Sequence, residues 1–346
     1  MTEAHAEPRP TGHTGGQADE TTRGTLLFAG DVYCDVVFSG VTAPEQGAEV
    51  FADAFAITPG GVANRAVAAA RAGAPTMLAS RLGDDVLGRH VYDVLTAEPF
   101  LDTSLLELVP GHQSAVSVAL TGPDDRSFIT YEEHLGPTVV PDDLGPVAAT
   151  HVGIAKPLPA WVARLRAAGT TVVGGVGWDH TGEWSGGVLD RLAEIDVFVP
   201  NDVEAMRYTR TDSALAAAKV LAERVPLAVV TRGPDGVVAV DSANGVVVTA
   251  DTVRVEAVDP TGAGDVFVAS FMAGVHHGWD LETRLRFAAA SAAFAVTGLG
   301  GAASAPHPDE LRTFLDRRAA PGDWSFLADV PSAGRTGADV PRAAGH

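Results

Sequence analysis

The second half of the chain carries short, continuous apolar runs rather than an alternation of apolar and polar residues. Four of these runs are His151–Ile154, Thr171–Val173, Val197–Val199 and Leu227–Val230. Segments with helical spacing separate them, at residues 159–168, 187–193 and 214–224. Strands that are apolar throughout are buried on both faces, and strands that alternate with helices form parallel sheets. We therefore predict an α/β fold in which helices cover both faces of a mostly parallel sheet.

Two other parts of the chain show a different pattern. Residues 114–120 and 127–131 alternate apolar and polar side chains on either side of a turn-like stretch, and residues 36–57 are glycine-punctuated and weakly alternating. Alternation with a period of two residues indicates strands that have one face in water. We predict that the chain forms a small β lid here, from about 36–57 and 112–134.

The stretch Asp259–Asp265 runs directly into the apolar segment Val266–Gly274. Its proline lacks an amide donor and its two glycines relax the backbone, so the stretch is a turn, and the apolar segment is predicted to be a buried helix. Such a helix start presents unpaired N–H groups at the positive end of the helix dipole, which is an anion site. Asp265 lies on the first turn, where we expect the dipole to keep its carboxylate ionised and able to take a proton from a hydroxyl.

Polar residues also follow the first predicted strand, at the end where α/β proteins bind ligands. Asp31 and Asp35 come after the apolar residues 25–29. A second glycine turn, at Gly60 and Gly61, opens an alanine-rich helix that contains Asn64. We predict that these residues meet at one edge of the sheet.

Asn201 and Glu204 follow a later strand and are three residues apart, so they share one face of a helix start. Their side chains offer the oxygen ligands that a hydrated Mg²⁺ prefers. Thr231, Gly233 and Gly236 follow the next strand along the chain.

The composition narrows the classes of partner. The net charge of −20 and the pI of about 4.8 argue against nucleic acids and anionic membranes, because both bind basic surfaces. No glycine is followed by lysine, which excludes a Walker-type phosphate loop. The single cysteine, Cys34, fits a reducing cytoplasm, and no apolar run approaches the roughly 20 residues of a membrane span. We expect a cytoplasmic protein.

The motif Asp-Pro-Thr-Gly-Ala-Gly-Asp before an apolar helix resembles the C-terminal signature of the ribokinase-like (phosphofructokinase-B type) sugar kinases. The resemblance covers about residues 24–318 and implies a three-layer fold with a mostly parallel sheet and a small β lid. It implies that Asp265 is the catalytic base and that Gly262, Ala263 and Gly264 form an anion hole. It also implies ATP as the phosphoryl donor.

The resemblance extends to the binding residues, which it assigns in three groups. Asp35, with Asp31 beside it, and Gly60, Gly61 and Asn64 would hold the substrate, although the segment from Gly61 to Asn64 is one residue shorter than in ribokinase. Asn201, Thr231, Gly233 and Gly236 would contact the nucleotide. Glu204 and Asn201 would hold Mg²⁺, in part through water, and Asp259 would belong to a K⁺ site that some members have. Where ribokinase places an adenine-contacting Asn, this chain has Ala289.

These observations predict an ATP-dependent kinase acting on a hydroxyl of a sugar or sugar-like molecule. We expect a disordered tail at 1–23, the kinase domain at 24–318 and a C-terminal tail at 319–346, with the lid forming a homodimer contact as in some members. The alternatives are a nucleoside kinase and a non-catalytic sugar- or nucleotide-binding regulator of the same fold. A nicotinamide oxidoreductase is disfavoured because Phe267 replaces the third glycine of its fingerprint. No role is predicted for residues 178–184.

Overall fold

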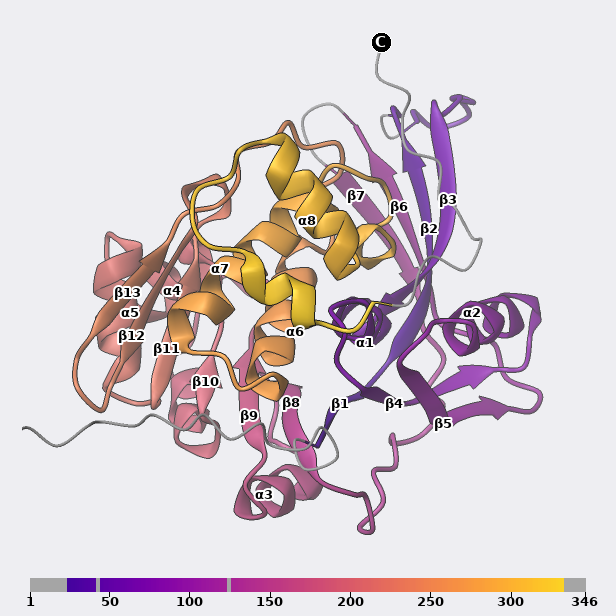
Figure 1. The fold of residues 1–346 in the computed structure, drawn as a ribbon. Coiled ribbons are helices and arrows are strands. Elements are labelled where there is room, and N and C mark those ends of the chain that lie inside the picture. The colour runs from indigo at the N-terminus through magenta and orange to yellow at the C-terminus, as the bar shows by residue number, and fades with distance from the viewer. Residues whose placement is uncertain (1–23, 42–43, 123–125, 333–346) are drawn as a thin grey trace, which may run out of the picture.

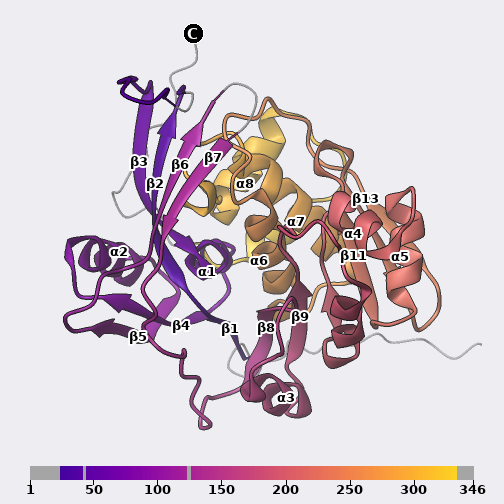
Figure 2. The same ribbon diagram turned by 180° about the vertical axis from the view of Figure 1, so that it is seen from behind.

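A computed structural model describes residues 24–41, 44–122 and 126–332 of the chain, so the predicted N-terminal tail lies outside the described residues. Two sheets and their helices are built from these residues (Figures 1 and 2). The strands are β1 (Thr25–Ala29), β2 (Val32–Ser39), β3 (Ala54–Gly61), β4 (Thr76–Gly83), β5 (Leu101–Val109), β6 (Val116–Thr121), β7 (Arg126–Tyr131), β8 (Val147–Gly153), β9 (Thr171–Gly175), β10 (Val197–Phe198), β11 (Leu227–Thr231), β12 (Val237–Asp241) and β13 (Val247–Ala250). The α-helices are α1 (Val62–Arg71), α2 (Val86–Thr96), α3 (Ala160–Ala167), α4 (Asp202–Thr209), α5 (Ala214–Ala222), α6 (Ala263–His276), α7 (Leu281–Ala295) and α8 (Pro308–Arg317). Short 3₁₀ helices are η2 (Gly186–Glu194), η3 (Gly233–Asp235), η4 (Gly301–Ser304) and η5 (Ser325–Asp329).

The large sheet has the order β13-β12-β11-β10-β9-β8-β1-β4-β5. All pairs from β11 to β5 are parallel, whereas β12 and β13 are added antiparallel at one edge. The four apolar runs of the second half became β8, β9, β10 and β11, as predicted. Because β1 and β8 are neighbours in the middle of the sheet, the residues that follow them lie together.

Helices cover both faces of this sheet, which confirms the three-layer prediction. One core packs α1, α6, α7 and α8 against the sheet, and a second core packs α3, η2, α4 and α5 against the other face. Successive residues of one strand enter different cores: Val172 faces the second and Val173 the first. This alternation is why the strands are apolar throughout.

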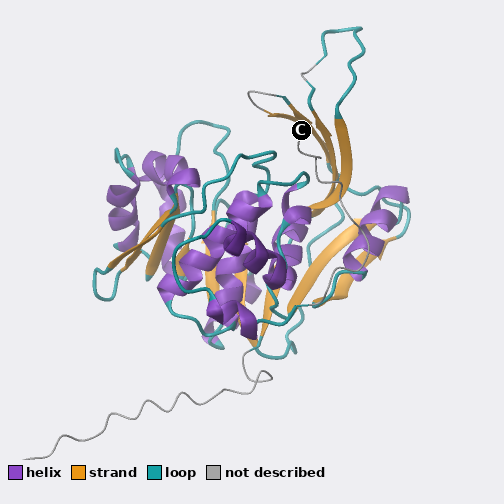
Figure 3. Ribbon diagram, turned by 45° about the horizontal axis from the view of Figure 1, so that its top comes forward, coloured by secondary structure: helices purple, strands orange, loops and turns teal. Residues whose placement is uncertain are grey.

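The small sheet has the order β3-β2-β6-β7 and stands clear of the large one (Figure 3). It begins earlier in the chain than the sequence predicts, because β2 starts at Val32 and β3 continues to Gly61. Asp35, Gly60 and Gly61 therefore lie on paired strands, and the predicted turn at Gly60 and Gly61 is wrong. The pairing of β2 with β3 ends at Gly61, immediately before α1.

The chain continues to contribute to the core beyond residue 318, so the predicted C-terminal tail is wrong for residues 319–332. Leu327 is 1% exposed and belongs to the core of α7 and α8. Trp279 and Phe287 meet Phe326 edge-on, with ring centroids 4.7 and 6.4 Å apart. Polar residues interrupt the large apolar side chains that anchor this segment, so the sequence shows no long apolar run here.

The segment 178–184, for which no role is predicted, packs beside α4. The Trp184 ring is buried edge-on against Tyr208, with centroids 5.1 Å apart. The Arg207 guanidinium lies over the rings of Trp178 and Trp184, at 5.3 and 5.2 Å. These contacts give the segment a packing role. In the part of the chain that is described, none of the helices combines the length and apolar character needed to cross a membrane.

Candidate active site

The predicted motifs come together where α1 and α6 begin, beside the carboxyl ends of β1 and β8. The two helices lie next to each other in both views, although about 200 residues separate them in the chain (Figures 1 and 2). The lid strands β2 and β3 lead directly into α1. Side chains from the sheet edge, the lid and both helices can therefore face one space.

The start of α6 is built as the sequence predicts. Gly262 is the residue before the helix and has φ 74°, a left-handed conformation that glycine adopts without strain. Gly264 is exposed, and a Cβ placed on it would meet nothing within 4 Å. The N–H groups of Gly264 and Asp265 have no acceptors within the helix, whereas that of Ala263 donates to the Pro260 carbonyl at 3.3 Å. The helix start can thus receive an anion.

Asp265 forms an ion pair with Arg65 of α1, through its Oδ1 atom and the Arg65 Nη1 atom. Its side chain keeps 25% of its surface exposed. Burial raises the pKa of Asp265, while Arg65 and a hydrogen bond from Asn64 act in the opposite direction. Arg65 and Asn64 thus favour the charged form, and the contribution expected from the helix dipole stays a prediction.

Arg65 is the main site residue that the sequence analysis missed. It lies in the first turn of a helix, where a positive charge is disfavoured by the helix dipole, and that position in an alanine-rich helix is the signal that could have revealed it. Its Nε atom is buried without a hydrogen-bond partner among the described residues. Arg65 is therefore held by Asp265 rather than by its local surroundings.

A cavity of about 340 Å³, which we call the central cavity, opens in front of Asp265. Its walls come from the lid and from α1 and α6, and they consist of Tyr33, Asp35, Gly61, Asn64, Arg65, Ser117, Thr130 and Asp265. Asp35, Gly61, Asn64 and Asp265 were all predicted site residues, and the fold brings them together. Ser117 and Thr130 show that the lid supplies part of the wall.

Asp35 lies deep in this site. Burial, together with the charge of Asp265, raises its pKa to about 6. Gly60 packs so closely on it that a Cβ at residue 60 would lie 2.1 Å from the Asp35 carboxyl carbon. Gly60 is thus required by close approach to the carboxylate. Tyr33, one wall of the cavity, donates its hydroxyl to Glu132 at 2.9 Å.

Asp31 does not line the central cavity but an adjoining one of about 260 Å³, which we call the side cavity. The side cavity shares Tyr33, Gly61 and Arg65 with the central cavity and lies at the ends of β1 and β8. His151 of β8 is another of its walls, which the sequence analysis treated only as part of an apolar strand.

Asn201 and Glu204 form a reciprocal cap at the start of α4. Asn201 Oδ1 accepts from the Glu204 N–H at 2.9 Å, and Glu204 Oε2 accepts from the Asn201 N–H at 3.1 Å. Burial raises the pKa of Glu204. Among the residues that the structure describes, no three His, Cys, Asp or Glu side chains gather as a metal site. A hydrated ion that takes one or two protein ligands and otherwise binds phosphates and water still fits this pair.

The predicted nucleotide contacts lie next to this cap, since Asn201 bridges to Thr231 at the end of β11. Gly233 and Gly236 flank the turn after Thr231 with φ of 52° and 83°. A Cβ on Gly236 would lie 2.2 Å from the Ala250 carbonyl oxygen, so this glycine is required by close packing of the backbone. Gly233 meets no such obstacle and lies beside open space.

Asp259 is 1% exposed and joins two loops. Its Oδ1 accepts from the Thr261 N–H at 2.9 Å and its Oδ2 accepts from the Gly300 N–H at 3.1 Å. It thereby ties the turn before α6 to the loop after α7. A role in holding a monovalent cation stays a prediction.

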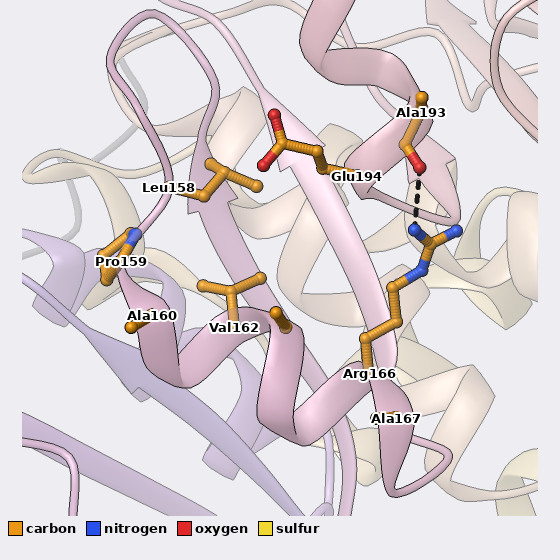
Figure 4. A pocket seen from close by; sticks show the side chains of 9 residues that line it. Leu158, Pro159, Ala160, Val162, Arg166, Ala167, Ala193 and Glu194 are labelled. Atoms are coloured by element: carbon orange, nitrogen blue, oxygen red, sulfur yellow. Dashed lines mark hydrogen bonds between the residues drawn. The ribbon is translucent and has the colours of Figure 1, made fainter.

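A further groove of about 450 Å³ lies between α3 and η2, away from all of these motifs (Figure 4). Leu158, Pro159 and Val162 form its apolar wall, and Arg166 closes one end by donating to the Ala193 carbonyl at 2.7 Å. It presents none of the predicted site residues.

Known proteins share both the sequence pattern and the fold. Residues 42–308 match the pfkB family of carbohydrate kinases. The chain is 28% identical over 289 residues to the deoxyribokinase of Salmonella typhi, covering 79% of this chain and 92% of that protein. The aminoimidazole riboside kinase of Salmonella enterica, solved with aminoimidazole riboside and an ATP analogue, superposes with a TM-score of 0.67 at 26% identity, covering 84% of this chain and all of that one. Arabidopsis thaliana ribokinase, solved with ribose and ATP, superposes with a TM-score of 0.70 at 23% identity over 84% and 98% of the two chains.

The chain is therefore a sugar or nucleoside kinase. The chain belongs to the pfkB family of carbohydrate kinases.

Proposed function

We propose that this protein transfers the γ-phosphoryl group of ATP to a hydroxyl of a sugar or nucleoside bound in the central cavity. The observation that supports this most directly is the position of Asp265. Its carboxylate lies on the first turn of α6, faces the central cavity and stands beside Asn64 and Asp35. A base, an anion site and polar groups for the acceptor thus share one space.

In this proposal Asp265 takes the proton of the reacting hydroxyl. Its Oδ2 atom serves as the base, since Oδ1 is paired with Arg65. The N–H groups from Gly262 to Asp265, including that of Ala263, stabilise the charge on the phosphoryl group in transit. Asp35, Gly60, Gly61 and Asn64 position the acceptor, with Asp31 at the edge of the site. The rate gain then comes from positioning and electrostatics, as in phosphoryl transfer generally.

Mg²⁺ and ATP belong to the same proposal. Glu204 and Asn201 would hold a hydrated Mg²⁺ that neutralises the nucleotide phosphates, and Thr231, Gly233 and Gly236 would contact the nucleotide. The exposed edge at Gly233 and the bridge between Asn201 and Thr231 support this placement. K⁺ would bind near Asp259.

The lid also suggests how the protein assembles. Its strand β7 carries Ile129 with 67% of its surface exposed, and Phe55 in β3 and Phe51 just before it are exposed as well. Apolar side chains on strands that project from the body favour burial against a second copy of the chain. We propose a homodimer through the lid.

Replacing the base tests the catalytic assignment. The variant Asp265→Asn should lose at least roughly 10² in kcat, because it removes general-base catalysis while keeping the side-chain shape. Turnover is measured as ADP release with ATP, Mg²⁺ and a panel of pentoses, hexoses, sugar acids and nucleosides.

The variant Asp142→Asn is the matched control, since Asp142 is also paired with an arginine, Arg164, but lies outside the site. It should keep the wild-type kcat. Near-normal turnover of Asp265→Asn would refute the base assignment. If the wild-type protein released no ADP with any of these acceptors, the non-catalytic regulator would be favoured instead.

A further inference from the structure

The proposed transfer reaction takes place in the central cavity and does not use the side cavity. It measures about 260 Å³, several times the space of a water molecule, and shares Tyr33, Gly61 and Arg65 with the central cavity. An acceptor whose reacting hydroxyl faces Asp265 can therefore extend into it. The donors, acceptors and charges of its walls indicate which chemical group of the acceptor would bind there.

His151 provides polar atoms in the wall of the side cavity. Its side chain is 8% exposed, lines the side cavity and has no hydrogen-bond partner among the described residues. Burial and the charge of Arg65 hold its pKa well below the usual range, so the ring is neutral and offers one N–H donor and one nitrogen acceptor. A ligand that both accepts and donates would pair with both ring nitrogens.

The charges around the cavity disfavour an anionic group. Arg65 is the cation that lines it, and its guanidinium is already paired with Asp265. Asp31 lines the cavity as well, and Asp35 lines the adjoining central cavity. A carboxylate or phosphate would meet these acids without an uncommitted cation. A neutral group with N–H donors and oxygen or nitrogen acceptors matches the set.

Gly153 is one wall of the side cavity and contributes no side chain to it. This residue ends β8, and a Cβ placed on it would meet nothing within 4 Å. Its backbone is not in the left-handed region, so the fold does not require glycine there. The absence of a side chain leaves room for the ligand.

We propose that the acceptor is a nucleoside, with its sugar in the central cavity and its heterocyclic base in the side cavity, where His151 and Asp31 bond to the base. A free pentose would leave His151 unpaired and the side cavity to water. The base of a nucleoside is neutral, planar and carries both donors and acceptors. This inference rests on the proposed kinase activity and names the class of acceptor for it.

Acceptor kinetics test the proposal. With ATP and Mg²⁺, kcat/KM is measured for ribose, 2-deoxyribose, fructose, cytidine, uridine, adenosine and inosine. At least one nucleoside should exceed every free sugar by roughly tenfold or more, because a single well-matched group in a pocket contributes discrimination of that order. A free sugar preferred over all four nucleosides would overturn the proposal.

The variant Gly153→Leu fills the side cavity and should lower the ratio of nucleoside to ribose kcat/KM by at least roughly tenfold. Gly145→Leu is its control, because residue 145 lies before the opposite end of β8 and its Cβ would also meet nothing within 4 Å. That variant should keep the ratio. Equal losses for nucleoside and ribose in Gly153→Leu would contradict the placement of the base.

Calorimetric binding measurements test the nucleoside subsite independently of kinase activity. The Asp265→Asn protein is titrated calorimetrically with the same nucleosides and with ribose. Nucleoside binding that weakens when Gly153→Leu is added supports the subsite, whether or not the wild-type protein transfers phosphate. If the wild-type protein phosphorylated no acceptor but nucleosides still bound, the kinase proposal alone would be refuted. Absence of nucleoside binding would sink this one.

Discussion

At the residue scale, the site depends on two acids held in different ways. Asp265 is paired with Arg65 across two helices, whereas Asp35 is buried against Gly60 and has its pKa raised to about 6. Burial raises the pKa of both acids, but only Asp265 has neighbours, Arg65 and Asn64, that act to lower it. Their surroundings therefore suit Asp265 to proton transfer and Asp35 to hydrogen bonding with the acceptor.

Arg65 is predicted to act as a positioning residue for Asp265. In the proposed mechanism the base form of Asp265 takes the proton, so kcat should fall as pH drops through its pKa. Arg65 acts to lower that pKa, so Arg65→Gln should move the acid limb of the kcat profile to higher pH. The measurement is kcat against pH under saturating ATP and acceptor.

Arg65→Lys is the companion variant, because it keeps the charge and should leave the limb closer to that of the wild type. If Arg65 served packing alone, both variants would lower the melting temperature and leave the acid limb in place. That result would contradict its role toward Asp265.

At the element scale, the two sheets contribute different parts of the site. The large sheet places strand ends and helix starts at one edge, and the lid adds Ser117 and Thr130 to the central cavity from β6 and β7. The lid is a sheet of four strands that has the main body on one side and exposed apolar residues around its outer strands. The homodimer proposed above would bury those residues.

The lid provides the prediction at this scale. Ile129→Asp places a charge in the proposed dimer contact, where burying it without a partner is unfavourable, so the protein should become monomeric. Sedimentation equilibrium measures the mass. The control Val246→Asp changes a residue that is exposed to a similar degree between β12 and β13 and should leave the dimer intact. A wild-type protein that is monomeric at all concentrations would refute the lid dimer.

At the scale of the whole molecule, the fold extends further along the chain than its motifs do. The segment after α8 returns to α7, where Trp324 receives Arg286 over its ring at 4.6 Å and Phe326 packs on Trp279. α7 in turn packs on α6, which carries Asp265. The end of the described chain therefore supports the helix layer behind the active site.

Leu327 tests that support. Leu327→Ala should lower the free energy of unfolding by about 2–5 kcal/mol, the usual loss for emptying a buried leucine site. Leu215→Ala, at an exposed position of α5, should change it by about 0.5 kcal/mol or less. Urea denaturation gives both values. Equal, small effects would mean that residues 319–332 do behave as a tail.

Several features were predictable because they depend on local sequence. The four apolar runs of the second half read correctly as parallel strands, since burial on both faces leaves no alternation. The helix that follows Asp259–Asp265 was also predicted, because glycines and proline mark its start. By contrast, Gly60 and Gly61 looked like a turn, because glycine is permissive in a turn and in a strand that lies against a carboxylate.

The sequence by itself determined the alternation of strands and helices in the second half, the helix after Asp259–Asp265 and the family to which these motifs point, because these follow from neighbouring residues. The tertiary structure alone decided that Arg65 meets Asp265, that His151 faces an open cavity and that Leu327 enters the core. Each of those depends on contacts between segments far apart in the chain, and no local pattern encodes which distant side chain will lie opposite. The cytoplasmic location expected from the sequence stays a prediction.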